Sequence, residues 1–112
     1  VWTSARGREG VAGEILLATR NSGECLVQFA KPPFTLATAR TITGAWSLEQ
    51  ASARGPKRGR GPGPGDVVWF ALAEAMRGRP VCHGWHFAGR SGGAWCLTNA
   101  LTGEVLEGFF AP

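Results

Sequence analysis

The chain lacks several residue types and motifs that would assign it to a functional class. It has no tyrosine, only two histidines and one methionine among 112 residues, and Asp66 is its single aspartate. The glutamates are spread through turns and solvent-facing positions, so no acid–base pair stands out, and we predict that the protein is not an enzyme. No GxxxxGK[ST] or GxGxxG pattern precedes a helix, which argues against a phosphate-binding loop. We therefore expect no cofactor.

Long apolar runs are also missing, and cysteine is scarce. No run approaches the roughly 20 residues of a membrane-spanning helix. No signal peptide is visible, but the sequence opens at Val1 without methionine, so nothing follows from that. Three cysteines, Cys25, Cys82 and Cys96, are too few for a disulfide-rich scaffold and form no CxxC pair. Whether Cys82 and Cys96 form a disulfide across a hairpin or stay as two buried thiols is left open.

The composition that remains is typical of one globular domain, with 44% hydrophobic and 18% charged residues. We expect residues 1–10 to be a loose lead-in and residues 11–112 to form a single β domain. The formal net charge of +4 is concentrated in one segment of that domain. This segment, ASARGPKRGRGPGPG (51–65), predicts a basic Gly/Pro surface loop without regular structure.

Alternating apolar residues between turn signals predict about seven antiparallel strands. The segment ALAEAMRG instead combines good helix formers with a following Gly78, and predicts a short helix at about 71–77. We therefore expect a mainly β fold: a single antiparallel sheet, curled into a half-barrel or open barrel, with one short helix over it. The expected strands cover residues 13–20, 25–31, 34–43, 45–50, 66–70, 81–88 and 94–99, and LTGE forms the last turn before the closing segment EVLEGFF.

The segment CHGWHF (82–87) has the residue types of a metal site. In a strand, however, Cys82 and His86 lie about 13 Å apart at roughly 3.3 Å per residue, too far for one zinc ion to bridge. The tripeptide HGW resembles half of the motif of a Rieske cluster. A complete Rieske cluster needs two cysteines and two histidines in separate loops. We predict no metal here. The segment is expected to be a strand with a partly buried His83 on the same face as Val81, Trp85 and Phe87.

Two sets of residues are candidates for binding. A curved sheet lined by large apolar side chains can hold an apolar ligand, and the candidate lining residues are Phe34, Trp46, Trp69 and Trp85. The candidate anion-binding residues are Arg54, Lys57, Arg58 and Arg60, which could contact nucleic acid, anionic lipid or an acidic partner. A solvated hairpin linker is the alternative interpretation of this second set.

The order of the segments resembles the small periplasmic proteins related to LolA and LolB, the carrier and receptor of outer-membrane lipoproteins. The resemblance spans about residues 11–110 and rests on strand rhythm and turns in GEILLATRNSGECLVQFAKPPF, GAWSLEQ, DVVWFALAEAMRGRP, VCHGWHF, GAWCLTN and LTGEVLEGFF. It implies a strongly curved, incompletely closed sheet whose inner surface accepts acyl chains beneath short helices. The chain departs from that family in its shortness, its single expected helix and its basic loop.

Together these observations predict a non-enzymatic cell-envelope protein that binds an acyl chain, lipid or lipoprotein in a concave apolar face. Its expected location is the periplasm or the outer membrane, with the cytoplasm left open. Two other functions stay open as well. One is a nucleic-acid-binding module that uses the basic 54–60 loop, and the other is a structural subunit with a protein partner in a larger assembly.

Overall fold

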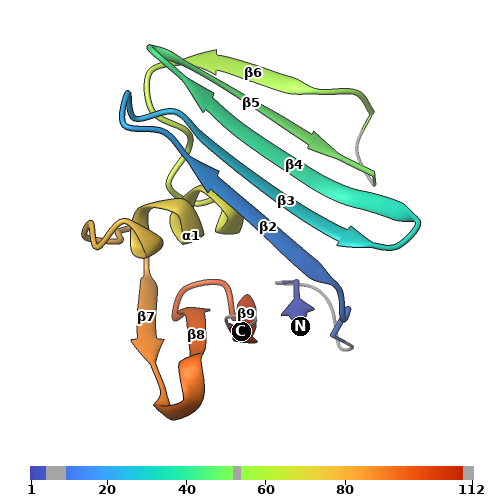
Figure 1. Cartoon of the computed structure of the whole chain (residues 1–112), viewed down its shortest axis with the longest axis vertical. Coiled ribbons are helices and arrows are strands. Elements are labelled where there is room, and N and C mark those ends of the chain that lie inside the picture. Colours follow the sequence, from blue (N-terminus) through green and yellow to red (C-terminus); the bar gives the residue numbers. More distant parts are fainter. Residues whose placement is uncertain (5–9, 52–53, 110–112) are drawn as a thin grey trace.

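The structure is a computed structural model that describes residues 1–4, 10–51 and 54–109. In this part of the chain nine β-strands form two antiparallel sheets, and one α-helix lies between them (Figure 1). The larger sheet, in spatial order, comprises β2 (Glu14–Thr19), β3 (Cys25–Lys31), β4 (Phe34–Ile42), β5 (Ala45–Gln50) and β6 (Lys57–Arg60). The smaller sheet comprises β1 (Trp2–Thr3), β9 (Val105–Phe109), β8 (Ala94–Asn99) and β7 (Trp85–Gly89). The helix α1 spans Val68–Met76.

The mainly β character is confirmed, but the prediction of a single sheet of about seven strands is wrong. After β6 the chain enters the buried helix α1, and the strands that follow pair with the N-terminal Trp2–Thr3 instead of with β6. The two sheets meet at one β-bridge, in which Trp2 and Val11 exchange backbone hydrogen bonds of 2.9 and 2.7 Å. Beyond that bridge the sheets diverge, and no closed barrel forms in the described residues.

The first four strands of the larger sheet lie where the sequence predicts them. Their alternation is visible in β3, where Cys25, Val27 and Phe29 are buried against α1 while Leu26 and Gln28 face the other side. The same inner face continues into β5 with the buried Leu48. Because side chains alternate along a strand, one face of this sheet packs on the helix and the opposite face is left to solvent.

Parts of two expected loops are ordered into strands. Within the lead-in 1–10, Trp2–Thr3 form β1 against β9, whereas residues 5–9 lie outside the described residues. Within the basic loop 51–65, Lys57–Arg60 form β6 against β5, which corrects the prediction of no regular structure there. The ladder partner, not local propensity, supplies the hydrogen bonds of β6. Residues 52–53 of that loop lie outside the described residues.

Glycine in the basic segment has a packing role that composition alone did not indicate. Gly59 lies directly opposite Trp46 in the β5–β6 ladder, and a Cβ at this position would collide with the indole ring. A Cβ at Gly63 would likewise collide with the ring of Phe70. The two glycines therefore allow the backbone of this segment to pack directly against the rings of Trp46 and Phe70.

The helix α1 begins earlier than predicted. The segment 66–70 was expected to be a strand because of its two valines and its aromatic residues, yet the helix starts at Val68. Every residue from Val68 to Ala73 is buried, so contacts on all sides outweigh the weak β preference. The end of the helix follows the prediction. Gly78 adopts a φ of 70°, and the Arg79 N–H donates to the Glu74 carbonyl at 3.0 Å, as in a Schellman cap.

One cluster of buried side chains joins both sheets to the helix. At its centre the ring of Phe29 stacks on that of Trp69, with centroids 5.1 Å apart, and Trp2 packs on Trp69 at 5.4 Å. The smaller sheet contributes the fully buried Leu97 and Leu106. Burial of each such side chain stabilises the fold by roughly 1.5–3 kcal/mol, so the two sheets depend on α1 for their shared core.

Candidate functional site

The segment CHGWHF is a turn followed by the start of a strand. The expected strand 81–88 is observed only from Trp85 to Gly89. Before it, His83 and Gly84 adopt left-handed φ values of 61° and 87°, which no continuous strand permits. His83 is exposed, so the prediction that it is partly buried on an apolar strand face is wrong. Among the described residues, no group of three or more His, Cys, Asp or Glu side chains could hold a metal ion.

A buried asparagine holds this turn in place. Asn99 donates from its side-chain amide to the His83 carbonyl at 3.0 Å. Its Oδ1 accepts hydrogen bonds from the backbone of Leu101 at 2.8 Å and of Thr102 at 3.0 Å. The left-handed conformation of His83 is therefore fixed by a residue of β8, and the role of the turn is structural.

The three thiols are free and differ in exposure. Cys25 and Cys96 are buried, whereas Cys82 is exposed before the start of β7. Cys96 lies opposite Ala88 in the β7–β8 ladder, so Cys82 and Cys96 form neither a disulfide nor a pair of buried thiols. Burial raises the pKa of the Cys25 thiol, an effect that the charge of Arg77 opposes and that of Glu74 reinforces.

The four candidate apolar residues do not gather around one cavity. Phe34, at the start of β4, is 68% exposed, and Trp46 packs edge-on against Phe70 with centroids 5.8 Å apart. Trp69 and Trp85 are buried in the core, where the Trp85 indole donates to the Gly65 carbonyl at 2.8 Å. None of the four lines the groove of about 820 Å³ beside β2.

That groove lies where the two sheets diverge, between β2 and the ends of β8 and β9, and has a volume of about 820 Å³. Its floor includes Leu72 and Met76 of α1 and Trp95 of β8. Charged residues at its margins are Glu14, Arg90 and Glu107. An apolar floor with a few charges at the rim is the usual character of a small-molecule site.

The walls of the groove are strand edges. Consecutive residues 12–17 line it, and so do consecutive residues 107–109. Because successive side chains of a strand point to opposite faces, a run of consecutive lining residues places the edge itself at the groove. β2 is the outer strand of the larger sheet, and its outer edge has no ladder partner among the described residues. On β9 the ladder with β1 reaches Glu107, whose backbone exchanges hydrogen bonds of 2.9 and 2.7 Å with Val1. The free edge of β2 and the short end of β9 beyond Glu107 therefore face the same space.

The sequence contains only an indirect signal for this groove. Ile15, Leu16 and Leu17 form an apolar run on both faces of β2, and Leu16 is 55% exposed. An apolar run in an outer strand without lysine or proline lacks the usual protection against pairing with another chain. The divergence of the sheets depends on the pairing of β1 with β9, and no local pattern predicts that.

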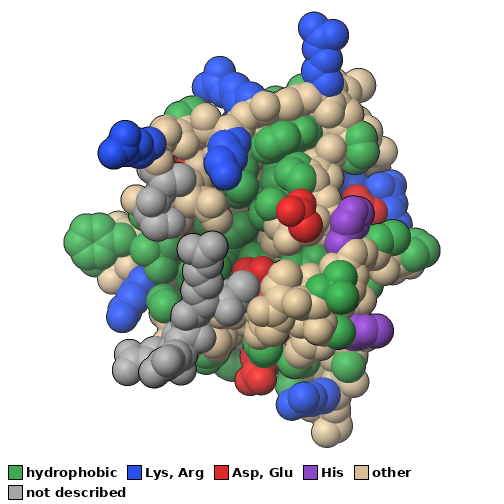
Figure 2. Space-filling model, turned by 180° about the vertical axis from the view of Figure 1, so that it is seen from behind, with side chains coloured by type: hydrophobic (Ala, Val, Ile, Leu, Met, Phe, Trp, Pro, Cys, Tyr) green, Lys and Arg blue, Asp and Glu red, His purple; other side chains and the backbone are tan. Residues whose placement is uncertain are grey.

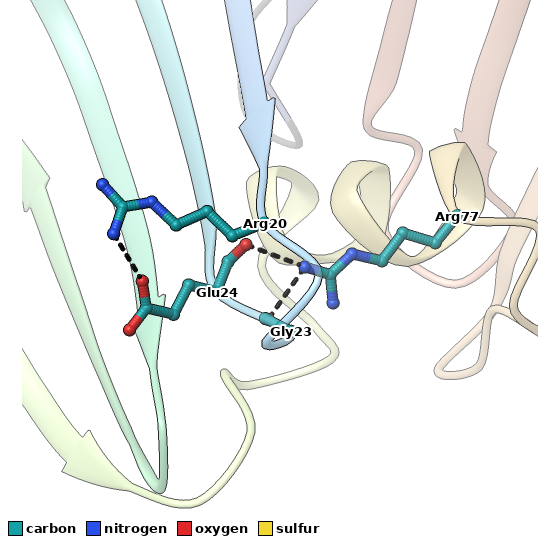
Figure 3. A network of polar contacts seen from close by, with 4 residues as sticks. All are labelled: Arg20, Gly23, Glu24 and Arg77. Atoms are coloured by element: carbon teal, nitrogen blue, oxygen red, sulfur yellow. Dashed lines mark hydrogen bonds and ion pairs between the residues drawn. The ribbon is translucent and has the colours of Figure 1, made fainter.

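A second cavity, of about 530 Å³, opens at the other side of α1, and its lining includes Glu74, Arg77 and His83. Arg77 lies beside it and donates from Nη2 to the carbonyls of Gly23 at 2.8 Å and Glu24 at 3.1 Å (Figure 3). In the same turn, Arg20 pairs with the Glu24 carboxylate at 3.3 Å (Figure 3). These contacts connect the helix to the β2–β3 turn, and the guanidinium of Arg77 therefore has a structural role.

The candidate anion-binding residues lie along the opposite edge of the larger sheet from β2. Lys57, Arg58 and Arg60 belong to β6, and Arg54 precedes that strand; all four are exposed. Because successive side chains of a strand point to opposite faces, Arg58 and Arg60 face one side of the sheet and Lys57 faces the other. The structure thus divides the three cations of β6 between two faces.

Comparison with protein-family models, curated proteins and solved structures found no match. The described residues contain no helix with the length and apolarity needed to span a membrane.

Proposed function

We propose that this protein is a non-enzymatic binding protein that takes an acyl chain, or the acyl chain of a lipid or lipoprotein, into the groove between β2 and β9. The observation that carries this proposal is the groove itself, whose volume of about 820 Å³ falls within the common range for small-ligand sites. In this proposal the diverging sheets act as an open half-barrel of the cell envelope, and α1 forms the floor beneath the ligand.

The margins of the groove suit an amphipathic ligand. Arg90 is exposed at the rim and can pair with the carboxylate or phosphate of a headgroup. Leu72 and Met76 offer an apolar path below it. Burying a methylene chain there contributes roughly 0.8 kcal/mol for each CH₂ removed from water.

Quenching by fatty acids brominated on the chain tests this proposal, because bromine quenches nearby indoles. Trp95 lines the groove and Trp46 does not. We expect quenching in the wild type, much weaker quenching in Trp95→Phe and unchanged quenching in Trp46→Phe. Equal quenching in both variants, or none in the wild type, would refute the assignment of the groove.

A substitution in the floor provides a second test by direct binding. Met76→Glu places a carboxylate on the apolar floor and should weaken fatty-acid binding at least about tenfold, which corresponds to roughly 1.4 kcal/mol. Leu101→Glu, at a 78% exposed position in the turn before β9, introduces the same charge away from the groove and should leave affinity unchanged.

A second candidate function rests on the free edge of β2. An acyl chain cannot pair with backbone N–H and C=O groups, whereas an extended peptide of a partner protein can add a strand to β2. This would make the chain a subunit of a larger assembly. Hydrogen exchange distinguishes the two occupants, since a peptide strand would protect amides of β2 and a fatty acid would not.

A further inference from the structure

On the outer face of the larger sheet, the one turned away from α1, two of the candidate anion-binding arginines are aligned with a third arginine that the sequence analysis did not single out. Arg40 of β4 lies opposite Ser47 of β5, and Ser47 lies opposite Arg58 of β6. Residues directly opposite in antiparallel strands share a face, so Arg40 and Arg58 lie in one row. Arg60 is two residues beyond Arg58 and therefore points to the same side.

These three arginines, which we call the arginine face, have little local compensation. Within the described residues none of them forms a salt bridge, and all three are exposed. The described acidic side chains on or beside this face are Glu49, which lies opposite Thr38, and Glu24, which lies near Arg40 and pairs with Arg20 at 3.3 Å. Figure 2 shows Lys and Arg side chains projecting along the upper margin of the molecule, where β5 and β6 lie in Figure 1.

Aliphatic side chains are interleaved with the arginines. Ile42, which is 51% exposed, lies opposite Ala45, and Ala45 lies opposite Arg60. Leu26 lies opposite Arg40 in the same manner. The rows thus place aliphatic side chains beside the guanidinium groups, and among the described residues no aromatic side chain shares this face of β4–β6. Proteins that hold single-stranded nucleic acid stack bases on aromatic rings, and that element is missing from these rows.

We propose that the arginine face docks on a bilayer surface that contains anionic lipids. Arg40, Arg58 and Arg60 pair with phosphate groups, while Leu26 and Ile42 lie at the level of the headgroups. Charge complementarity drives the contact, so it weakens as salt screens the surface. The face is formed by β4–β6, at the opposite edge of the sheet from the groove beside β2. Docking therefore does not depend on what the groove binds.

Co-sedimentation with vesicles tests this proposal. We expect the wild type to bind vesicles of phosphatidylglycerol and phosphatidylcholine at low salt, to bind less at high salt, and not to bind pure phosphatidylcholine. The triple variant Arg40→Gln, Arg58→Gln, Arg60→Gln should lose about 100-fold in partition coefficient, since each basic residue near an anionic surface contributes roughly fivefold.

A matched control removes the same charge elsewhere. Lys31→Gln, Lys57→Gln, Arg79→Gln changes three exposed cations that do not lie on the arginine face and should retain most of the binding. Equal losses in the two triple variants would mean that net charge alone attracts the protein, and would overturn the proposal. Absence of wild-type binding to anionic vesicles would overturn it as well. The proposal would also be overturned if the wild type bound an oligonucleotide but not vesicles, and if the first triple variant lost that oligonucleotide binding. Circular dichroism of both variants confirms that they fold.

Discussion

The Nη2 atom of Arg77 lies 2.8 Å from the carbonyl oxygen of Gly23 and so joins the end of α1 to the β2–β3 turn across 54 positions of sequence. A second hydrogen bond, to the Glu24 carbonyl, shares this nitrogen and is partly buried. The pair of contacts fixes the helix against the larger sheet at the polar side of the core, where aromatic packing does not reach.

Removal of this side chain should destabilise the fold. Arg77→Met retains much of the apolar volume but leaves two carbonyls without a donor, so we expect the free energy of unfolding to fall by about 1–3 kcal/mol in urea titrations. Arg79→Met is the control, because the Arg79–Glu74 pair is exposed and should contribute no more than about 0.5 kcal/mol. Similar losses in both variants would contradict a special role of Arg77.

Gly59 should tolerate no side chain. Gly59→Ala introduces a methyl group into the space of the Trp46 ring, and we expect a loss of about 1–3 kcal/mol together with a shifted tryptophan emission. Gly89→Ala is the control, since a Cβ at Gly89 has no heavy atom within 4 Å. If Gly59→Ala were as stable as Gly89→Ala, β6 would not lie on Trp46 as described.

The turn of CHGWHF should depend on Asn99. Asn99→Ala leaves the His83 carbonyl and the backbone N–H groups of Leu101 and Thr102 without their partner, so we expect a loss of about 2–3 kcal/mol in chemical unfolding. Asn99→Asp keeps the oxygen that accepts both N–H groups and removes only the donor to His83. An aspartate variant less stable than the alanine variant at neutral pH would argue against this assignment of the hydrogen bonds.

Glu104 should make stability depend on pH. Burial raises the pKa of its carboxyl above the ordinary value of 4.5, and the hydrogen bond from the Trp2 indole, 2.7 Å long, offsets this only in part. The folded state then holds the proton more readily than the unfolded state. Its contribution to stability is therefore complete below pH 4.5 and is lost as the pH rises through the raised pKa.

Glu104→Gln tests this dependence because the amide still accepts from Trp2 and carries no charge. We expect the difference in unfolding free energy between variant and wild type to shift in favour of the variant as the pH rises above 4.5, as measured by urea unfolding across a pH series. A constant difference across that range would show that Glu104 does not titrate differently in the folded state.

The thiols should react in two classes. Cys82 is exposed and should be alkylated by iodoacetamide in the folded protein, whereas Cys25 and Cys96 should react only after unfolding. For Cys25 the raised pKa further lowers the thiolate fraction at neutral pH. Mass spectrometry of the labelled peptides identifies the sites. Rapid labelling of Cys96 in the native protein would contradict its burial in β8.

Much of the fold could be predicted because the residues within a strand, or at the end of a helix, determine it without reference to distant parts of the sequence. The alternation in CLVQFAK and AWSLEQ places Val27 and Leu48 on the buried face, and Gly78 ends α1 as its position indicates. The start of α1 could not be predicted, since Val68 favours a strand until it is enclosed on all sides. The strand β6 could not be predicted either, because its hydrogen-bond partner is β5. The requirement for glycine at position 59 arises only because Trp46 lies opposite it.

The candidate sites were less predictable because they depend on pairings that are distant in sequence. The groove forms next to the point where β1 pairs with β9 through Trp2 and Leu106, because beyond this pairing the end of β9 lies across the groove from β2. The arginine face requires the register that brings Arg40 into line with Arg58 through Ser47. Large aromatic residues such as Trp69 indicated a lined cavity, but the same bulk serves to fill the core.

The pairing of β1 with β9 has a consequence for the order of assembly during synthesis. The strands β2–β6 are neighbours in both sequence and space, so this meander can form while the rest of the chain is still on the ribosome. β1 must wait, because its partner Leu106 is translated more than a hundred residues after Trp2. Until then the buried face of α1 has only one of its two sheets, and the nascent chain presents apolar surface that a chaperone can bind.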